Sequence, residues 1–158
     1  MNHLTLKDYL GPYDDDRITP EVRQNGERLV AIVNVVLAAA EADGVELHID
    51  PDTRTHIGGN GNGGVRPLDS PVGAKHSAHK RGTGIDPYDP FRELARWSLR
   101  NIERLKLLGI RAMENPRWTP TWVHWQSTPL SSGNFVFIPN ATPPLAEALP
   151  EQKSTELA

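Results

Sequence analysis

The stretch Ser77-Ala78-His79-Lys80-Arg81-Gly82-Thr83-Gly84-Ile85-Asp86 places a histidine seven positions before an aspartate. Two glycines lie between them and let the chain bend, so that His79 and Asp86 can converge on one point. A further histidine, His124, stands in Trp122-Val123-His124-Trp125. Zinc accepts two imidazoles and one carboxylate as ligands and leaves a fourth position open for water or substrate. The pattern therefore predicts a metal centre formed by His79, Asp86 and His124.

The composition limits which ligands and partners are plausible. The chain has 158 residues, of which 37% are hydrophobic and 23% charged, as expected for one globular domain. A formal net charge of -3 gives no electrostatic reason to expect nucleic acid or an anionic membrane as a partner. The chain contains no cysteine, so any metal must be bound by His, Asp or Glu.

The N-terminal sequence and the most apolar stretch indicate neither a signal peptide nor a membrane span. Residues 1–8 lack a basic segment followed by a long apolar one. The stretch 29–42 is too short to cross a bilayer and is interrupted by Asn34 and Glu41. We therefore expect synthesis in the cytoplasm, with any export by another route.

Two helices are predicted from apolar residues at helical spacing, each followed by a glycine. The first spans residues 20–43, where Thr19 is the expected N-cap and a proline occupies the first helical position. The second spans residues 90–108, with Asp89 as the expected cap.

Three strands are predicted, mostly late in the chain. Alternating apolar and polar residues indicate strands at 45–49, 121–126 and 134–138, and residues 129–133 are expected to form the turn between the last two. The resulting class is α+β, a small antiparallel sheet with flanking helices. We expect one domain over residues 1–140. The tail 141–158 contains three prolines and many charges and is predicted to be flexible.

The segment 56–75 is rich in glycine, asparagine and proline, and its run Gly58–Gly64 cannot form a regular element. Two interpretations are open. The segment is either a flexible surface loop or a loop that borders a substrate cleft, where the backbone must approach a ligand closely.

The pattern Ser-x-His-x-x-Gly-x-Gly-x-Asp in residues 77–86 closely resembles the Ser-x-His-x-x-Gly-x-Ala-x-Asp motif of zinc D-alanyl-D-alanine carboxypeptidases, which belong with the hedgehog-type and lysostaphin-type folds. Gly64-Val65-Arg66-Pro67 resembles that family's upstream arginine motif, and Trp122-Val123-His124 resembles its aromatic-x-His segment. The three motifs occur in the family's order. The resemblance covers roughly residues 4–140 and points to a branch common in bacteriophages.

The resemblance implies a role for each matched residue. His79, Asp86 and His124 would bind Zn²⁺. Arg66 would hold the carboxylate of the substrate, a task that suits a guanidinium because its fork pairs with both oxygens. Ser77 would support the site rather than act as a nucleophile.

The sequence departs from the family at the general base. Metal-assisted hydrolysis needs a group that takes a proton from water and passes it to the leaving amine. Many relatives carry a glutamate three positions before the last histidine, where this chain has Thr121. Three alternatives remain. Glu114 acts as the base because Pro116 and Pro120 fold the connection back, another group such as His76 replaces it, or catalysis is weak or lost.

The resemblance thus predicts a zinc-dependent peptidase that cuts peptidoglycan stem peptides, either a D-Ala-D-Ala carboxypeptidase or an endopeptidase. It would be a phage lysin that acts at the cell wall after phage-assisted release, or as part of the virion. The alternative is a catalytically weak or inactive structural protein of the tail or capsid, which keeps the fold and has other virion proteins as partners. Thr121, the glycine-rich loop and the proline-rich tail favour this alternative.

Overall fold

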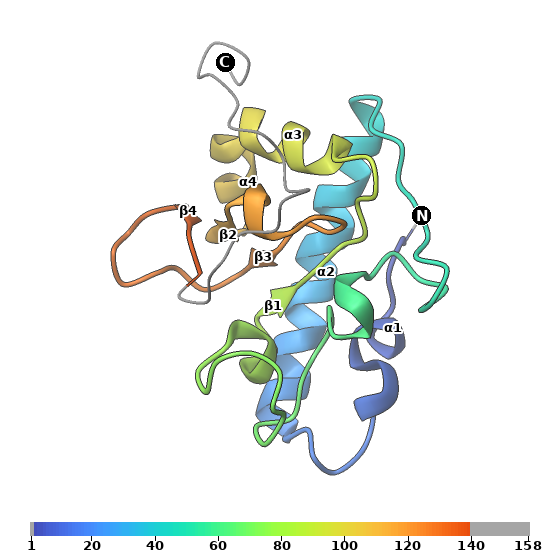
Figure 1. Ribbon diagram of the computed structural model, residues 1–158, viewed down its shortest axis with the longest axis vertical. Coiled ribbons are helices and arrows are strands. Elements are labelled where there is room, and N and C mark those ends of the chain that lie inside the picture. The colour runs from blue at the N-terminus through green and yellow to red at the C-terminus, as the bar shows by residue number, and fades with distance from the viewer. Residues whose placement is uncertain (1, 140–158) are drawn as a thin grey trace.

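The computed structural model describes residues 2–139. Its longest element is helix α2, Pro20–Ala42, which runs through the length of the molecule (Figure 1). Thr19 caps the helix by accepting a hydrogen bond from the amide of Val22, and Pro20 begins it where no intrahelical donor is needed. The predicted helix over residues 20–43 is therefore confirmed to within one residue.

Helix α1, Leu6–Leu10, packs against α2 and is followed by the 3-10 helix η1, Gly11–Tyr13. A capping box fixes its start, because Thr5 and Asp8 each accept a hydrogen bond from the other's backbone amide. The ring of Tyr9 lies against Gly26 of α2, where a Cβ atom would come within 2.7 Å of the ring. The small residue thus allows α1 and α2 to approach closely.

The second predicted helix is in fact two helices, α3 at Glu93–Arg100 and α4 at Ile102–Leu108. Asn101 separates them because its backbone leaves the helical region and its side chain donates to the carbonyl of Trp97. The start was also predicted three residues too early. The carboxylate of Asp89 does accept the amides of Leu94 and Ala95, but Arg92 lies between in a left-handed conformation.

The sheet has four short strands: β1 at Gly84–Ile85, β2 at Ala112–Glu114, β3 at Trp125–Gln126 and β4 at Val136–Phe137. Their order is β1-β3-β2-β4. Strand β3 is antiparallel to both of its neighbours, whereas β2 and β4 run parallel. The α+β class is confirmed, but the prediction of a purely antiparallel sheet is wrong.

Two strand predictions fail for identifiable reasons. The strands expected at 121–126 and 134–138 do not pair as a hairpin, because β2 lies between β3 and β4 and takes the hydrogen bonds of both. The strand expected at 45–49 does not form. Val45 and Leu47 instead pack against the core from an irregular segment that has no neighbouring strand.

The core fills the space around α2 and beneath the sheet. It is built from apolar side chains of every part of the described chain, including Leu4, Tyr9, Leu29, Val33, Leu37, Ile85, Leu94, Trp97, Leu105, Met113 and Trp125. In residues 2–139, no helix has both the length and the apolar character needed to cross a bilayer. The predicted flexible tail, 141–158, lies outside the described residues.

Candidate metal centre

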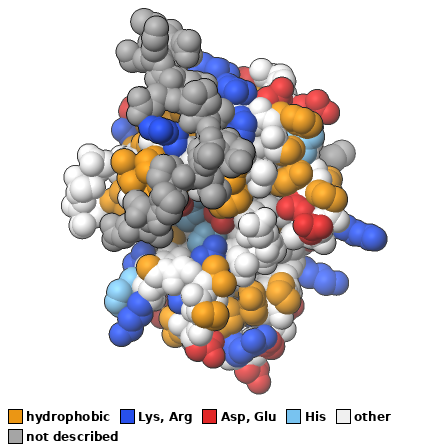
Figure 2. Space-filling model, viewed as in Figure 1, with side chains coloured by type: hydrophobic (Ala, Val, Ile, Leu, Met, Phe, Trp, Pro, Cys, Tyr) orange, Lys and Arg blue, Asp and Glu red, His pale blue; other side chains and the backbone are white. Residues whose placement is uncertain are grey.

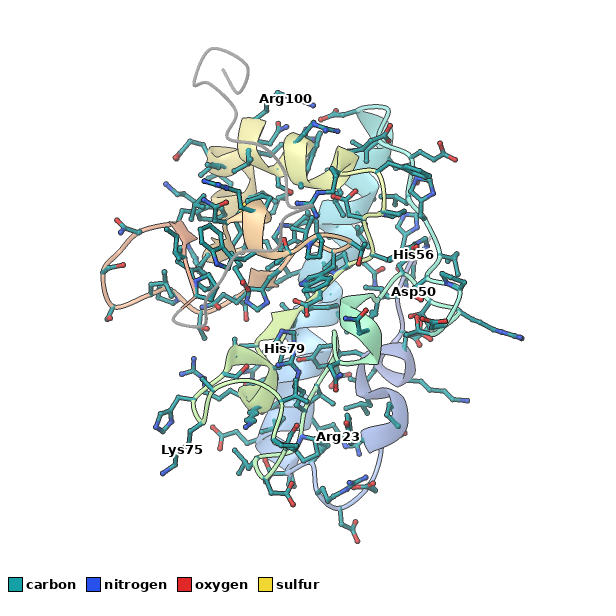
Figure 3. All side chains as sticks on the ribbon, viewed as in Figure 1. Arg23, Asp50, His56, Lys75, His79 and Arg100 are labelled. Carbon is teal, nitrogen blue, oxygen red and sulfur yellow. The ribbon has the colours of Figure 1, made fainter. Side chains whose placement is uncertain are left out.

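The structure brings His79, Asp86 and His124 together in one buried cluster. The Nε2 atom of His79 lies 3.2 Å from Nδ1 of His124 and 3.3 Å from Oδ1 of Asp86. The distance between His124 Nδ1 and Asp86 Oδ1 is 2.8 Å. Figure 3 shows His79 near the middle of the molecule, in front of the ribbon of α2. The three donor atoms therefore form a small triangle.

This triangle has the dimensions that a tetrahedral ion requires. At metal–nitrogen distances of about 2.0–2.1 Å, neighbouring ligand atoms lie about 3.3 Å apart. Two sides match that length, and the third is shorter because His124 and Asp86 are hydrogen-bonded directly. The group could thus hold a metal ion.

Local backbone structure positions His79. The histidine lies in the 3-10 helix η3, Ala78–Arg81, where the hydroxyl of Ser77 accepts the amide hydrogen of His79 at 3.3 Å. Gly82 ends η3 in the left-handed conformation, φ 74°, which turns the chain back toward β1. Ser77 thus caps η3 next to His79, and the supporting role that the motif implies for it stays a prediction.

Strand register positions the other two ligands and Glu114. Ile85 of β1 and Met113 of β2 both pair with Trp125 of β3. At the next position of each strand pair, Asp86 and Glu114 therefore lie on either side of His124. Directly opposed residues on antiparallel strands project to the same face. The amide of Glu114 donates to the carbonyl of His124 at 3.2 Å, which extends this row into β2.

Glu114 was expected in a connection that two prolines fold back, and this detail is wrong. It lies at the end of β2, Ala112–Glu114, a strand that the sequence analysis missed. Burial raises the pKa of Glu114 to about 7, with His124 and Arg66 opposing the shift and Asp86 adding to it. The carboxyl group therefore lies within the electrostatic field of the cluster. By contrast, Thr121 and His76 are exposed.

The charges of the cluster are strongly coupled. Burial disfavours the ionised form of Asp86, but the two imidazoles outweigh it and hold the pKa of that carboxyl well below its usual range. Burial lowers the pKa of His79. Burial lowers the pKa of His124, but the hydrogen bond and the charge of Asp86, together with Glu114 and Gln126, outweigh it and raise that pKa. A buried carboxylate that stays ionised between two imidazoles suits a cation site.

Arg66 lies beside the cluster, and the contact with a substrate carboxylate that the motif implies for it stays a prediction. Its Nη2 atom is 3.7 Å from Oδ2 of Asp86, and its Nε donates to the carbonyl of Asn62 at 2.8 Å. The backbone amide of Arg66 donates to the carbonyl of His79, so the two residues are held side by side. Figure 2 shows histidine and basic side chains in a hollow near the centre of the viewed face.

The glycine-rich segment borders the cluster. The carbonyl of Gly63 accepts the amide of Asp86, and the carbonyl of Gly64 accepts Nδ1–H of His79, each at 2.8 Å. Both glycines are buried. Of the two interpretations of this segment, the structure favours a loop that packs against a site over a flexible surface loop.

Sequence reasoning gave no role to Gln126, which lies two residues after His124 in the predicted strand 121–126. The structure puts its Oε1 atom 3.1 Å from Nε2 of His124, inside the protein. The alternation of a strand signalled the shared face but not the contact.

Comparison of the chain with family models, with curated proteins and with solved structures finds no match. The case for a function therefore depends on the motifs and on the geometry of the cluster.

Proposed function

We propose that this protein is a zinc-dependent peptidase that hydrolyses peptidoglycan stem peptides. The observation that carries the proposal is the row Asp86–His124–Glu114 across β1, β3 and β2, with His79 completing the donor triangle. In this row Glu114 is the neighbour of His124 and is not one of the three residues of the triangle. The order of the three motifs further supports a fold of the hedgehog and D-Ala-D-Ala-peptidase type.

In this proposal, His79 Nε2, His124 Nδ1 and Asp86 Oδ1 hold the ion. Bound Zn²⁺ supplies Lewis acidity, which polarises a carbonyl group and acidifies water. Glu114 accepts a proton from the attacking water and returns it to the leaving amine. A glutamate whose pKa lies near neutrality is suited to both steps.

Arg66 orients the substrate in this proposal. Its guanidinium group is largely buried beside Asp86, and pairing with a terminal carboxylate of the peptide would orient the scissile bond toward the cluster. This role favours a substrate that ends near the cut, such as the D-Ala-D-Ala terminus. A cut within the stem or cross-bridge is the second possibility for the same machinery. We infer a phage lysin that acts at the cell wall.

The test is to incubate zinc-loaded protein with purified peptidoglycan and to identify the products by mass spectrometry. We expect released D-alanine or shortened stem peptides, and loss of turnover in His124→Ala. The exposed histidine variant His76→Ala is the matched control and should retain activity. Stoichiometric zinc without turnover would overturn the enzyme proposal in favour of an inactive virion protein. No zinc binding at neutral pH would overturn the metal centre itself.

A further inference from the structure

Gln126 has two hydrogen-bond partners inside the protein, and one of them fixes how its amide is oriented. Its side chain is buried on β3, and its Nε2 atom lies 2.8 Å from the carbonyl oxygen of Thr128. A backbone carbonyl can only accept a hydrogen bond, so the amino end of the amide must face Thr128. The carbonyl end, Oε1, therefore faces His124.

The orientation of Gln126 decides the hydrogen position on His124. Oε1 can only accept, so Nε2 of His124, at 3.1 Å, must carry a hydrogen. The other ring nitrogen, Nδ1, is then the one that faces Asp86 and His79. His79 is fixed in the opposite sense, because the carbonyl of Gly64 accepts Nδ1–H and leaves Nε2 toward the cluster.

We propose that Gln126 is a positioning residue for the metal ligand His124, holding it as the Nε2–H form so that Nδ1 binds the ion. The inference rests on the metal centre proposed above and adds to it the partner that orients one ligand. Outer partners of metal-binding histidines fix ring orientation and tautomer, and their loss costs roughly 10–100-fold in metal affinity.

The neutral amide also matters for the charge of the site. The three proposed ligands include one carboxylate, which neutralises only part of the charge of a divalent cation. Gln126 gives His124 a hydrogen-bond acceptor without adding a second buried negative charge.

The hydrogen bonds of Gln126 continue through Thr128, whose hydroxyl lies 3.4 Å from the hydroxyl of Thr83, in the segment that precedes β1. The orientation of His124 is thus linked through Gln126 and Thr128 to the segment that precedes β1.

The first test compares zinc affinity in three variants by competition with a chelator. Gln126→Met keeps the volume but removes the acceptor, and we expect roughly 10–100-fold weaker zinc binding. Gln126→Glu keeps an acceptor for His124 and should stay within several-fold of the unaltered protein. The exposed change Gln24→Met is the matched control and should have no effect. A purely structural role predicts the reverse order, because a buried extra charge is more disruptive than methionine.

The second test needs no substitution and so holds even where a variant fails to fold. Long-range ¹H–¹⁵N spectra of the zinc-loaded protein should show His124 protonated at Nε2 and metal-bound at Nδ1. Metal bound at Nε2, or equal affinities for Gln126→Met and Gln24→Met, would overturn the role of Gln126 while leaving the metal centre intact. Failure of the unaltered protein to bind zinc would overturn both.

Discussion

Glu114 and His124 face each other across neighbouring strands, with the amide of Glu114 hydrogen-bonded to the carbonyl of His124 at 3.2 Å. Strand pairing thus brings Glu114 beside His124 from ten positions earlier in the chain. Thr121, which stands where the carboxypeptidase motif described above has a glutamate, is exposed. A threonine there is therefore compatible with catalysis, because β2 offers a carboxyl group from the other side.

Replacement of Glu114 by glutamine tests this arrangement. The amide has nearly the same shape but cannot accept a proton from water, so we expect turnover of peptidoglycan to fall roughly 10²–10⁴-fold. Zinc stoichiometry should not change, because Glu114 is not among the three ligands. The variant Thr121→Ala is the control and should retain activity. Full activity in Glu114→Gln would show that another group is the base.

The convergence of His79, Asp86 and His124 could be predicted from the sequence because two of them lie within one ten-residue motif. Helix α2 was also predictable, since 23 residues of regular apolar spacing bounded by Thr19 leave little ambiguity. In both cases the signal is local in the chain. Ser77 and Arg66 each stand within a short motif, so their nearness to His79 could be expected for the same reason.

The sheet could not be derived in the same way. Strand β2 has only three residues, too few for alternation to reveal it, and its pairing with β3 and β4 is set by tertiary contacts. The break at Asn101 and the late start of α3 depend on side-chain hydrogen bonds to the backbone. The position of Glu114 therefore followed from the structure alone.

Replacement of Arg66 by lysine tests its proposed contact with the substrate. Lysine keeps the charge but loses the planar fork, so we expect kcat/KM to fall roughly tenfold or more for a peptide with a free terminal carboxylate. A peptide whose terminus is amidated should be little affected by the change. Zinc affinity is measured in parallel, because Arg66 also lies 3.7 Å from Asp86. Equal losses on both peptides would contradict carboxylate recognition.

Stability should fall at acidic pH in part because of His56. Burial lowers the pKa of His56, whose Nδ1 donates to the carbonyl of His48 at 2.8 Å. The folded pKa lies below the unfolded value of about 6.5, so the unfolded chain binds more protons as pH falls. The stabilising contribution is thus complete above about pH 6.5 and is lost as pH falls through the folded pKa.

The measurement is urea unfolding of the metal-free protein between pH 7 and pH 5. We expect the unfolding free energy to decline with falling pH, and to decline less steeply in His56→Gln. His79 shifts the same way and remains in both proteins, so the difference between them isolates His56. The exposed residue His76, changed to glutamine, is the control. Identical slopes for the unaltered protein and His56→Gln would rule out this contribution.

Gly64 couples the metal cluster to helix α1, and its replacement by alanine should damage both stability and metal binding. An added Cβ atom would lie 2.1 Å from the carbonyl oxygen of Tyr9, which cannot move freely because it also accepts the amide of Val65. Overpacking against fixed backbone should lower the free energy of unfolding by about 2 kcal/mol or more. The carbonyl of Gly64 would shift with it, and so would the hydrogen bond that orients His79.

The control for this change is Gly133→Ala. Gly133 is exposed, an added Cβ would meet no atom within 4 Å, and only its φ of 77° opposes the substitution. That strain costs about 1 kcal/mol and arises at an exposed residue of the segment between β3 and β4. Urea unfolding and zinc affinity are measured for both variants. Gly64→Ala should lower both the free energy of unfolding and the zinc affinity, because the carbonyl of Gly64 orients the ring of His79. Gly133→Ala should lose some stability and keep its zinc affinity.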